Sequence, residues 1–328
     1  MGVGIGSLHL EGYEKHPDAE IVAIADASEE RGKSTAERFK VPQVYTDYAE
    51  MLAEAKLDAV SICTPNFLHA PQAIAAFEAG LHVICEKPIA TSAAEGQKMV
   101  DAGKKAGKIF MMGFNNRFRG DTQVLKRFID NGDLGNIYYA KTGWLRRRGI
   151  PGFGGWFTTK SQSGGGPLID LGVHVLDLAL YLMGNPKPVS AYGSAYAEFG
   201  PKMPDGEKYD VEDLATGLVK FENGATVLVE ASWASNIANE TSYTTLMGDK
   251  GGADLSPLRI YTELNGEQAD ITPQHPNING HQAEVLHFVD CIRDGKQPIA
   301  TGEHGLDVIK ILDAIYESAT TGDIVKIS

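Results

Sequence analysis

The chain has 328 residues, enough for two domains of ordinary size, and its 43% hydrophobic and 22% charged residues exclude a disordered or fibrous protein. A net charge of −13 would repel nucleic acid and anionic membranes, so neither is expected as a main partner. The apolar runs at residues 59–63 and 178–183 are far shorter than the roughly 20 residues that a membrane span needs.

The cysteines and the N-terminus indicate a cytoplasmic protein. Cys63, Cys85 and Cys291 are odd in number and widely spaced, which is typical of reduced thiols and not of a disulfide framework or a zinc site. The first residues show neither the basic region nor the cleavage site of a secretory signal. We therefore expect a cytoplasmic location and no bound metal.

Residues 1–114 alternate short apolar runs with helical patterns. The apolar runs, rich in β-branched residues, lie at residues 20–26, 58–63, 82–85 and 109–112. The helical patterns lie at residues 7–16, 28–39, 47–54, 70–79 and 92–106. Near-continuous apolar strands that alternate with helices predict a doubly wound parallel sheet, so the fold class is α/β.

Residues 115–328 follow a different plan. A long strand at 136–147 precedes a glycine-rich loop at 149–166 and a helix at 167–183. Strands at 214–221 and 225–233 flank Asn223-Gly224, a strong hairpin signal. Two further helices are expected at 282–293 and 303–318. This pattern predicts a second, α+β domain with an open and largely antiparallel sheet.

Glycines near the N-terminus predict a dinucleotide site. Gly4 and Gly6 stand where a strand would turn into a helix, so a pyrophosphate could approach the backbone and the helix N-terminus. Asp26 follows 20 residues after Gly6, at the end of the next strand, where an acid would hold the ribose hydroxyls of NAD. A tight glycine turn without a ligand is the alternative. Asp26 should also repel the 2′-phosphate of NADP, which favours NAD. The first basic residue after it, Arg31, should lie a turn further on in a helix that begins near Ser28.

The beginning of the chain leaves little room for a first strand. Only Met1 precedes Gly2, whereas a typical strand has roughly five residues. Residues 1–5 could serve as a short strand and displace the phosphate turn. Alternatively the start is truncated, the glycines keep the turn, and the central strand is missing or reduced to a residue or two. We expect the second arrangement, with weaker NAD binding than in a chain extended upstream.

Three later segments carry a family resemblance. They are Thr64-Pro65-Asn66 with His69, Glu86-Lys87-Pro88, and the stretch from Gly164 through Asp170 and His174 to Asp177. In this order they resemble the glucose–fructose oxidoreductase/inositol dehydrogenase (Gfo/Idh/MocA) family. The resemblance implies a Rossmann domain, a second domain that often makes the subunit contact, and NAD(P)-dependent oxidation of a sugar or polyol hydroxyl.

The resemblance also assigns residues. It implies Lys87 as the catalytic lysine, with a cis bond to Pro88, and Asp170 and His174 as the characteristic acid and histidine. The residues expected to contact the cofactor are Gly4, Gly6, Asp26, Thr64, Pro65, Asn66, His69, Glu86 and Lys87. A surface lysine at the end of a strand is the alternative reading of Lys87.

The helix after Gly166 supports this assignment by itself. It is apolar on almost every side, and its only acidic or basic residues are Asp170, His174 and Asp177, at spacings that share one stripe. Burying such a stripe is costly unless each group is paired, so a satisfied structural network is the alternative. We expect His174 to accept the hydroxyl proton, Lys87 to stabilise the alkoxide and Asp170 to anchor the substrate, with Asp177 structural.

Weaker substrate candidates lie outside these motifs. Asn116 and Arg117 could line the cleft or serve as a linker, and Arg148 could reach an anionic group or lie on a solvated strand. Trp156 could stack on a sugar ring or pack in the core.

These observations predict an NAD-dependent oxidoreductase of a sugar or inositol-like polyol. The alternatives are a glycosidase that uses NAD for a transient oxidation and a non-catalytic sugar sensor. A small-molecule partner is expected, and the exposed face of the second sheet predicts a homodimer or homotetramer.

Overall fold

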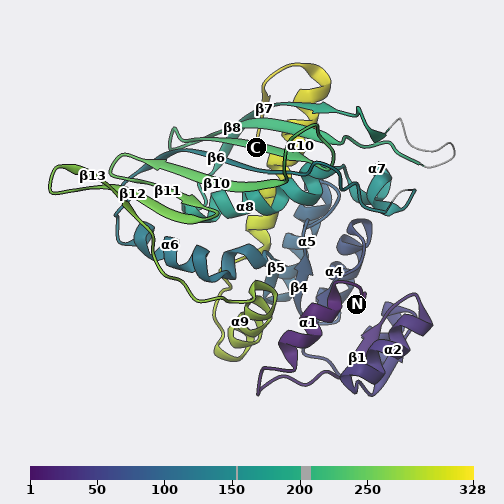
Figure 1. The fold of residues 1–328 in the computed structure, drawn as a ribbon. Coiled ribbons are helices and arrows are strands. Elements are labelled where there is room, and N and C mark those ends of the chain that lie inside the picture. The colour runs from purple at the N-terminus through teal and green to yellow at the C-terminus, as the bar shows by residue number, and fades with distance from the viewer. Residues whose placement is uncertain (153, 201–207) are drawn as a thin grey trace. The chain divides into compact units, whose positions relative to one another are not determined.

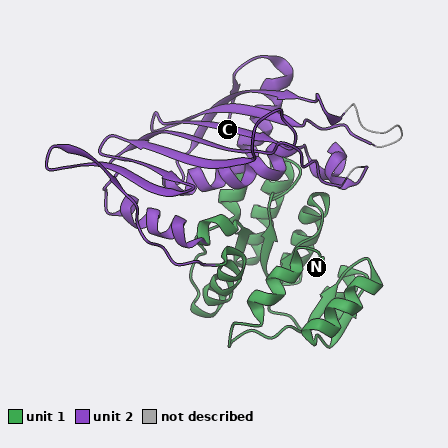
Figure 2. Ribbon diagram, in the orientation of Figure 1, with its two compact units in different colours: residues 1–118, 279–306 green, residues 119–278, 307–328 purple. Residues whose placement is uncertain are grey.

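The structure is a computed structural model that describes residues 1–152, 154–200 and 208–328, and these form two compact units (Figure 2). Unit 1 comprises Met1–Phe118 and Asn279–Leu306, and unit 2 comprises Arg119–Ile278 and Asp307–Ser328. The expected second domain included residues 279–306, which instead pack on the first unit. The reason is the apolar face of this segment, where Val285 lies against Gly12 so closely that a Cβ on Gly12 would approach it within 2.7 Å.

Unit 1 is the predicted parallel α/β fold (Figure 1). One two-stranded sheet pairs β1 (Ala23–Ala25) with β2 (Gln43–Tyr45), and a three-stranded sheet has the order β3 (Ala59–Ile62), β4 (His82–Glu86), β5 (Phe110–Gly113). All of these pairings are parallel. Strand β2 was not predicted, because its three residues are only half-buried and form no continuous apolar run.

The helices of unit 1 begin where the sequence provides caps. Ser28 and Ser92 accept hydrogen bonds from the backbone N–H groups of Arg31 and Glu95, three residues into their helices, and Asp47 accepts one from Ala49. The helices are α1 (Gly6–Tyr13), α2 (Glu29–Phe39), α3 (Tyr48–Glu54), α4 (His69–Glu78), α5 (Ala93–Ala106) and α9 (Gly280–Asp294), with the 3₁₀ turns η1 (Asn66–Leu68) and η2 (Asn115–Phe118).

Met1 and Gly2 lie between the two sheets of unit 1. The Met1 amino group donates to the Ser61 carbonyl at 2.7 Å, and the Met1 carbonyl accepts from Cys63 N at 2.8 Å. On the other side, Gly2 N donates to the Ala25 carbonyl at 2.8 Å. Residues 1–5 form no strand in the structure and α1 starts at Gly6, so no strand at these residues displaces the glycine turn. Two residues therefore bridge β1 and β3 in the place of a central strand.

Unit 2 contains a nine-stranded sheet in the order β13-β12-β11-β10-β6-β9-β8-β7-β14 (Figure 1). Its pairings are antiparallel except for the parallel pair β6–β9. The predicted hairpin joins β8 to β9 through Asn223-Gly224, where Gly224 has a φ of 83°. The strands are β6 (Ile137–Leu145), β7 (Pro188–Tyr196), β8 (Leu214–Phe221), β9 (Thr226–Ser232), β10 (Thr241–Gly248), β11 (Gly252–Leu255), β12 (Leu258–Leu264), β13 (Glu267–Ile271) and β14 (Val325–Lys326).

Helix α8 (Val173–Leu182) packs against β6, β9 and β10 of this sheet. A π-helical turn, η4 (Leu168–Gly172), leads directly into α8. The stretch Lys160–Leu182 is long and apolar enough to cross a membrane by composition, but 89% of its most apolar window is buried within the protein. Its apolar side chains are therefore covered by the protein itself. The remaining helices are α6 (Gly120–Asp130), the turn η3 (Trp156–Thr158), α7 (Lys160–Ser163) and α10 (Gly302–Thr321), which spans the boundary between the units.

Candidate functional site

Lys87 follows the last residue of β4, in a loop at the carboxyl edge of the parallel sheet. Its peptide bond to Pro88 is cis, as the family resemblance implied. Lys87 is half-buried, whereas the residues on both sides of it are buried, so it is the accessible residue of the three. Ligands of doubly wound folds bind at this edge. The position fits the predicted catalytic role, which stays a prediction.

Thr64, Pro65 and Asn66 follow β3, the strand beside β4, and lie at the same edge. The Thr64 hydroxyl donates to Gln72 at 2.8 Å, and Asn66 begins the turn η1 with its side chain buried. The loop is thus rigidly attached to the start of α4. Its predicted contact with the cofactor is compatible with this geometry.

His69 was predicted to contact the cofactor, and the structure assigns it a different place. The ring is completely buried, with Nδ1 2.8 Å from the Pro88 carbonyl and Nε2 2.8 Å from the Thr64 carbonyl. Burial lowers the pKa of His69, although the two carbonyls act in the opposite direction. His69 therefore braces the loops after β3 and β4 and is not exposed to a ligand.

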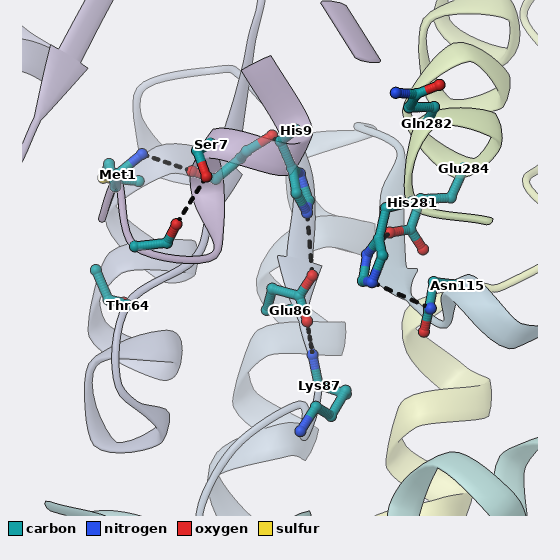
Figure 3. A network of polar contacts seen from close by, with 12 residues as sticks. Met1, Ser7, His9, Thr64, Glu86, Lys87, Asn115, His281, Gln282 and Glu284 are labelled. Carbon is teal, nitrogen blue, oxygen red and sulfur yellow. Dashed lines mark hydrogen bonds and ion pairs between the residues drawn. The ribbon is translucent and has the colours of Figure 1, made fainter. Parts of the chain in front are cut away.

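Glu86 also lies beneath the edge of the sheet. It is 5% exposed, its Oε1 is 3.0 Å from His9 Nε2, and its Oε2 accepts from the Lys87 backbone N at 3.3 Å (Figure 3). Burial would raise the pKa of Glu86, but the hydrogen bond and charge of His9, with smaller effects from Lys87 and His281, lower it to about 2. Contrary to the prediction of a cofactor contact, this ionised carboxylate is held by His9 and orients the backbone of Lys87.

His9 and Glu284, which belong to this buried group, were missed by the sequence analysis. The ligand atoms of His9, Glu86 and Glu284 lie within 4.8 Å of one another, a spacing that could suit a metal ion. However, His9 Nδ1 is 3.0 Å from Ser61 Oγ and Nε2 is 3.0 Å from Glu86. Both ring nitrogens of His9 therefore already have a partner within the protein. One available signal was His9 itself, a titratable residue among the buried positions of α1.

The glycine turn has the geometry that a pyrophosphate needs. Gly2 has a φ of 78°, and a Cβ there would lie 2.7 Å from the Cys63 carbonyl oxygen. A Cβ on Gly4 would meet nothing within 4 Å, so the space above this residue is open. Helix α1 begins at Gly6, and the preceding residue, Ile5, supplies no side-chain cap. The described residues therefore fit a phosphate group at the start of α1, where the helix dipole favours negative charge.

Asp26 lies after β1 with an ion pair that the sequence analysis did not foresee. Arg31 reaches back one turn, its Nε 3.1 Å from both carboxylate oxygens and its Nη2 2.7 Å from Oδ1. The backbone N–H groups of Val3 and Ser28 donate to the same carboxylate at 2.9 Å. Burial would raise the pKa of Asp26, but Arg31 and these backbone groups lower it. The acid is ionised and buried, whereas the Arg31 side chain is 59% exposed.

In unit 2, Asp170 and His174 stand out by their exposure. Between Gly165 and Leu182 they are the only residues that are not buried. Asp170 lies in the π-helical turn η4 and His174 in the first turn of α8, and π-turns occur often at functional sites. Asp177 is 1% exposed, in agreement with the structural role expected for it. Asp170 and His174, the two predicted site residues, are therefore the residues of this stretch that solvent or a ligand can reach.

Two tryptophans support these side chains. The indole Nε1 of the fully buried Trp233 donates to Asp170 Oδ2 at 2.9 Å, which sets the direction of the carboxylate. The Trp144 ring lies 6.1 Å from the His174 ring between centroids, and its Nε1 donates to Glu240 at 2.7 Å. Trp144 was not predicted as a site residue. It places an aromatic surface beside His174, of the kind that packs against sugar rings.

Glu212 caps the start of the helical segment that carries Asp170. Its buried carboxylate accepts from Gly166 N at 2.8 Å, from Leu168 N at 3.1 Å and from the Tyr316 hydroxyl at 2.8 Å. A Cβ on Gly166 would lie 2.0 Å from the Glu212 carbonyl oxygen, so this position requires glycine. Burial raises the pKa of Glu212 against these hydrogen bonds. No spacing in the sequence pointed to Glu212, because it caps a helix more than 40 residues away.

The weaker substrate candidates have mixed positions. Arg117 is completely buried and donates to the Ile299 carbonyl, so it is a core residue of unit 1 and not a substrate ligand. Arg148 donates to the Ser235 carbonyl and to Asn236, which fixes it to a neighbouring loop. Trp156 is half-buried and stacked on Phe157, with ring centroids 3.8 Å apart. Asn116 is half-buried in η2, and nothing in its position argues for or against the prediction.

Comparisons with known proteins match both parts of the chain. Residues 1–114 match the family described as "Oxidoreductase family, NAD-binding Rossmann fold", and residues 126–327 match its C-terminal alpha/beta domain. D-glucoside 3-dehydrogenase of Escherichia coli is 36% identical over 96% of this chain and 92% of its own length. Myo-inositol 2-dehydrogenase of Thermotoga maritima is 28% identical over 93% of this chain and 90% of its own. A solved levoglucosan dehydrogenase in complex with NADH and levoglucosan superposes with a TM-score of 0.89 at 26% identity, covering 99% of this chain and 96% of the other.

A Rossmann unit with a glycine turn and a lysine at the edge of its sheet defines an oxidoreductase that uses a nicotinamide dinucleotide. The chain belongs to the Gfo/Idh/MocA oxidoreductase family, as the three sequence motifs indicated.

Proposed function

We propose that this protein transfers a hydride between NAD and a carbon that carries a ring hydroxyl of a sugar or cyclic polyol. The observation that carries the proposal is the exposure of Asp170 and His174 on a helix that is otherwise buried. Titratable groups opened to a ligand from an apolar helix are expected at a catalytic site. The relatives named for a glucoside, levoglucosan and myo-inositol support the substrate class, because all three are carbohydrates or cyclic polyols.

The residues divide the chemistry between them in this proposal. When bound, NAD supplies the hydride acceptor. His174 accepts the hydroxyl proton, Lys87 donates a hydrogen bond to the same oxygen as it becomes an alkoxide, and Asp170 accepts a hydrogen bond from a neighbouring hydroxyl. Trp144 offers its ring to the C–H face of the substrate. Gly4 and Gly6 hold the pyrophosphate, and Asp26 faces the adenosine ribose.

The test is a substrate panel with the purified protein. Free hexoses, alkyl and aryl glucosides, anhydrosugars, inositols and sugar acids are each incubated with NAD, and NADH formation is followed by absorbance. We expect turnover with at least one sugar or cyclic polyol and none in the Lys87→Ala variant. Release of an aglycone without net NADH would replace this proposal with the glycosidase alternative. Sugar binding with neither reaction would identify a sensor.

The coenzyme preference follows from Asp26. Its ionised carboxylate accepts hydrogen bonds and would repel a 2′-phosphate, so we expect kcat/KM to be at least about tenfold higher with NAD than with NADP. The Arg31 ion pair reduces this repulsion, because it neutralises part of the charge. Equal kcat/KM values for the two coenzymes in the unmodified protein would contradict the assignment of Asp26.

Two variants separate the contributions of Asp26 and Arg31 to the coenzyme preference. Asp26→Ser removes the negative charge but keeps Arg31 as a phosphate ligand, so the preference should move toward NADP by about tenfold or more. Arg31→Gln keeps Asp26 and removes the cation, so the preference for NAD should be retained or increased. Dissociation constants for NADH and NADPH from protein fluorescence give the same comparison without turnover.

We also propose that the sheet of unit 2 packs against a second copy of the chain. Helices cover one face, whereas Tyr192 and Leu218, which pair in register across β7 and β8, are 46% and 41% exposed on the other. Exposed apolar side chains gathered on a sheet favour a subunit contact. Light scattering at micromolar concentration should show a dimer or tetramer, and Leu218→Lys should shift it toward monomer. A strictly monomeric unmodified protein would contradict this proposal.

A further inference from the structure

The proposed reaction leaves one buried acid of unit 1 without a role. Glu284 of α9 is completely buried, and its Oε1 lies 3.3 Å from Nδ1 of His281, whose other ring nitrogen lies 3.2 Å from Asn115 (Figure 3). Its second oxygen, Oε2, is buried without a hydrogen-bond partner among the described residues. A buried carboxylate oxygen in this state is costly unless it carries a proton or is otherwise compensated.

Glu284 lies next to the pair that orients Lys87. A carboxylate oxygen of Glu284 is within 4.8 Å of the ligand atoms of both His9 and Glu86. Glu86 in turn accepts from the Lys87 backbone N–H. A chain of four residues therefore connects the buried acid on α9 to the peptide that carries the catalytic lysine, and all of it lies within unit 1.

The charges of the His9–Glu86–Glu284 cluster balance when Glu284 keeps a proton. Burial would lower the pKa of His9, but Cys63 and Glu86 outweigh it and raise the pKa, so the ring is an imidazolium. That single cation neutralises the ionised Glu86. Burial, helped by the charge of Glu86, raises the pKa of Glu284 to about 7 against the opposing effect of His281 and His9.

We propose that Glu284 is a positioning residue for Lys87: its carboxylic acid proton keeps the His9–Glu86 pair intact, and loss of that proton releases the Lys87 backbone from Glu86. An ionised Glu284 would repel the Glu86 carboxylate and compete for the His9 cation. The Glu86–Lys87 hydrogen bond of 3.3 Å is longer than the His9–Glu86 contact of 3.0 Å and would be the first of the two to open. This inference rests on the proposed role of Lys87.

Several other titratable or polar groups lie around Glu284. Helix α1 contributes His9 and Tyr13, β4 contributes Glu86, α9 itself contributes His281, and η2 contributes the neutral amide of Asn115. Burial raises the pKa of Tyr13 far above neutrality, so it does not change charge in the same range. The low pKa of Glu86 keeps it ionised there. Glu284 is therefore the group in the His9–Glu86–Glu284 cluster whose charge changes near pH 7.

Infrared spectroscopy tests the proton directly. Spectra of the unmodified protein at about pH 6 should contain the carbonyl stretch of a protonated carboxylic acid, and the band should disappear by about pH 9. Glu284→Gln should lose the part of this band that comes from Glu284, whereas Glu37→Gln, an exposed control on α2, should keep the whole band. This readout needs no substrate, so it stands or falls separately from the proposed dehydrogenase activity.

Stability gives a second readout with a definite sign. The pKa of Glu284 is higher in the folded protein than the ordinary glutamate value of about 4.5, so the folded state holds an extra proton between about pH 4.5 and 7. The unmodified protein should therefore lose thermal stability relative to Glu284→Gln as the pH rises through this range. Below about pH 4.5 this loss should be absent. The Tm difference between the two should grow from about pH 4.5 to about pH 7 and stay constant above that, while Glu37→Gln should show none.

The positioning role of Glu284 is tested by how the ratio of kcat values between variant and unmodified protein depends on pH. The kcat of Glu284→Gln divided by that of the unmodified protein should rise at least about threefold from pH 6 to pH 9, because the amide cannot ionise. Dividing the two removes the pH dependence of alcohol oxidation. A merely structural role would give a flat ratio. Glu284→Asp, which restores the acid, should show a pH dependence like that of the unmodified protein and covers the case of a poorly folded Gln variant.

Three results would overturn the inference. They are a flat ratio in a well-folded variant, the same infrared band in Glu284→Gln as in the unmodified protein, and a stoichiometric divalent cation in the purified protein whose removal by EDTA lowers Tm in the unmodified protein but not in Glu284→Gln. The last would show that the cluster holds a metal and not a proton. Absence of dehydrogenase activity with a normal infrared result would refute only the proposed reaction.

Discussion

Replacing Lys87 by alanine should lower kcat by about 10²–10³-fold, because the lost ammonium stabilises the developing alkoxide and acts mainly in the transition state. The Kd for NADH should change by less than about threefold, since the glycine turn and Asp26 remain. Stopped-flow kinetics for the reaction and fluorescence titration for the coenzyme measure the two effects separately. Buried residues on both sides of Lys87 should keep the fold intact, which circular dichroism would verify.

Two further lysine variants sharpen this result. Lys105→Ala removes an exposed lysine from the last turn of α5 and should leave kcat unchanged. Lys87→Arg keeps the charge but not the compact ammonium, so it should recover little of the lost activity. Near-normal turnover in Lys87→Ala would mean that the lysine only ends a strand at the surface.

Replacing His174 by alanine should lower kcat by about 10²–10⁴-fold, the range of a lost general base. Histidine is the side chain whose charge changes near neutral pH, so the variant should also lose the acidic limb of the pH profile of kcat/KM. The measurement is kcat/KM for the best panel substrate between pH 5 and 10. Added imidazole should restore part of the activity if the space left by the ring admits it.

Controls for His174 separate chemistry from stability. His275→Ala changes an exposed histidine of unit 2 and should not affect the pH profile. Asp177→Asn, one turn along the helix and buried, should lower Tm with little change in the shape of the pH profile. An unchanged kcat and pH profile in His174→Ala would exclude it as the base and leave Lys87 as the candidate.

Local patterns predicted most of the fold because each depends on neighbouring residues. Continuous apolar runs mark parallel strands buried on both faces, so β1, β3, β4 and β5 were found, whereas the half-buried β2 was not. Asn223-Gly224 predicted its hairpin because only a residue with a positive φ fits the turn. For α9 the helix was predicted, but the unit on which it packs was not. The apolar face of an amphipathic helix can pack against an apolar surface of either unit, so the pattern does not specify which one.

The sequence by itself determined the motifs that place Lys87, Asp170 and His174, since strand ends and helix spacing follow from short-range order. Only the tertiary structure decided how their neighbours are used. It buried Arg117 and His69, paired Asp26 with Arg31, and brought Glu212 to the start of the helix that carries Asp170. The physical reason is that burial and pairing of a polar group depend on residues far away in the chain. The spacing of residues along the chain carries no information about such contacts.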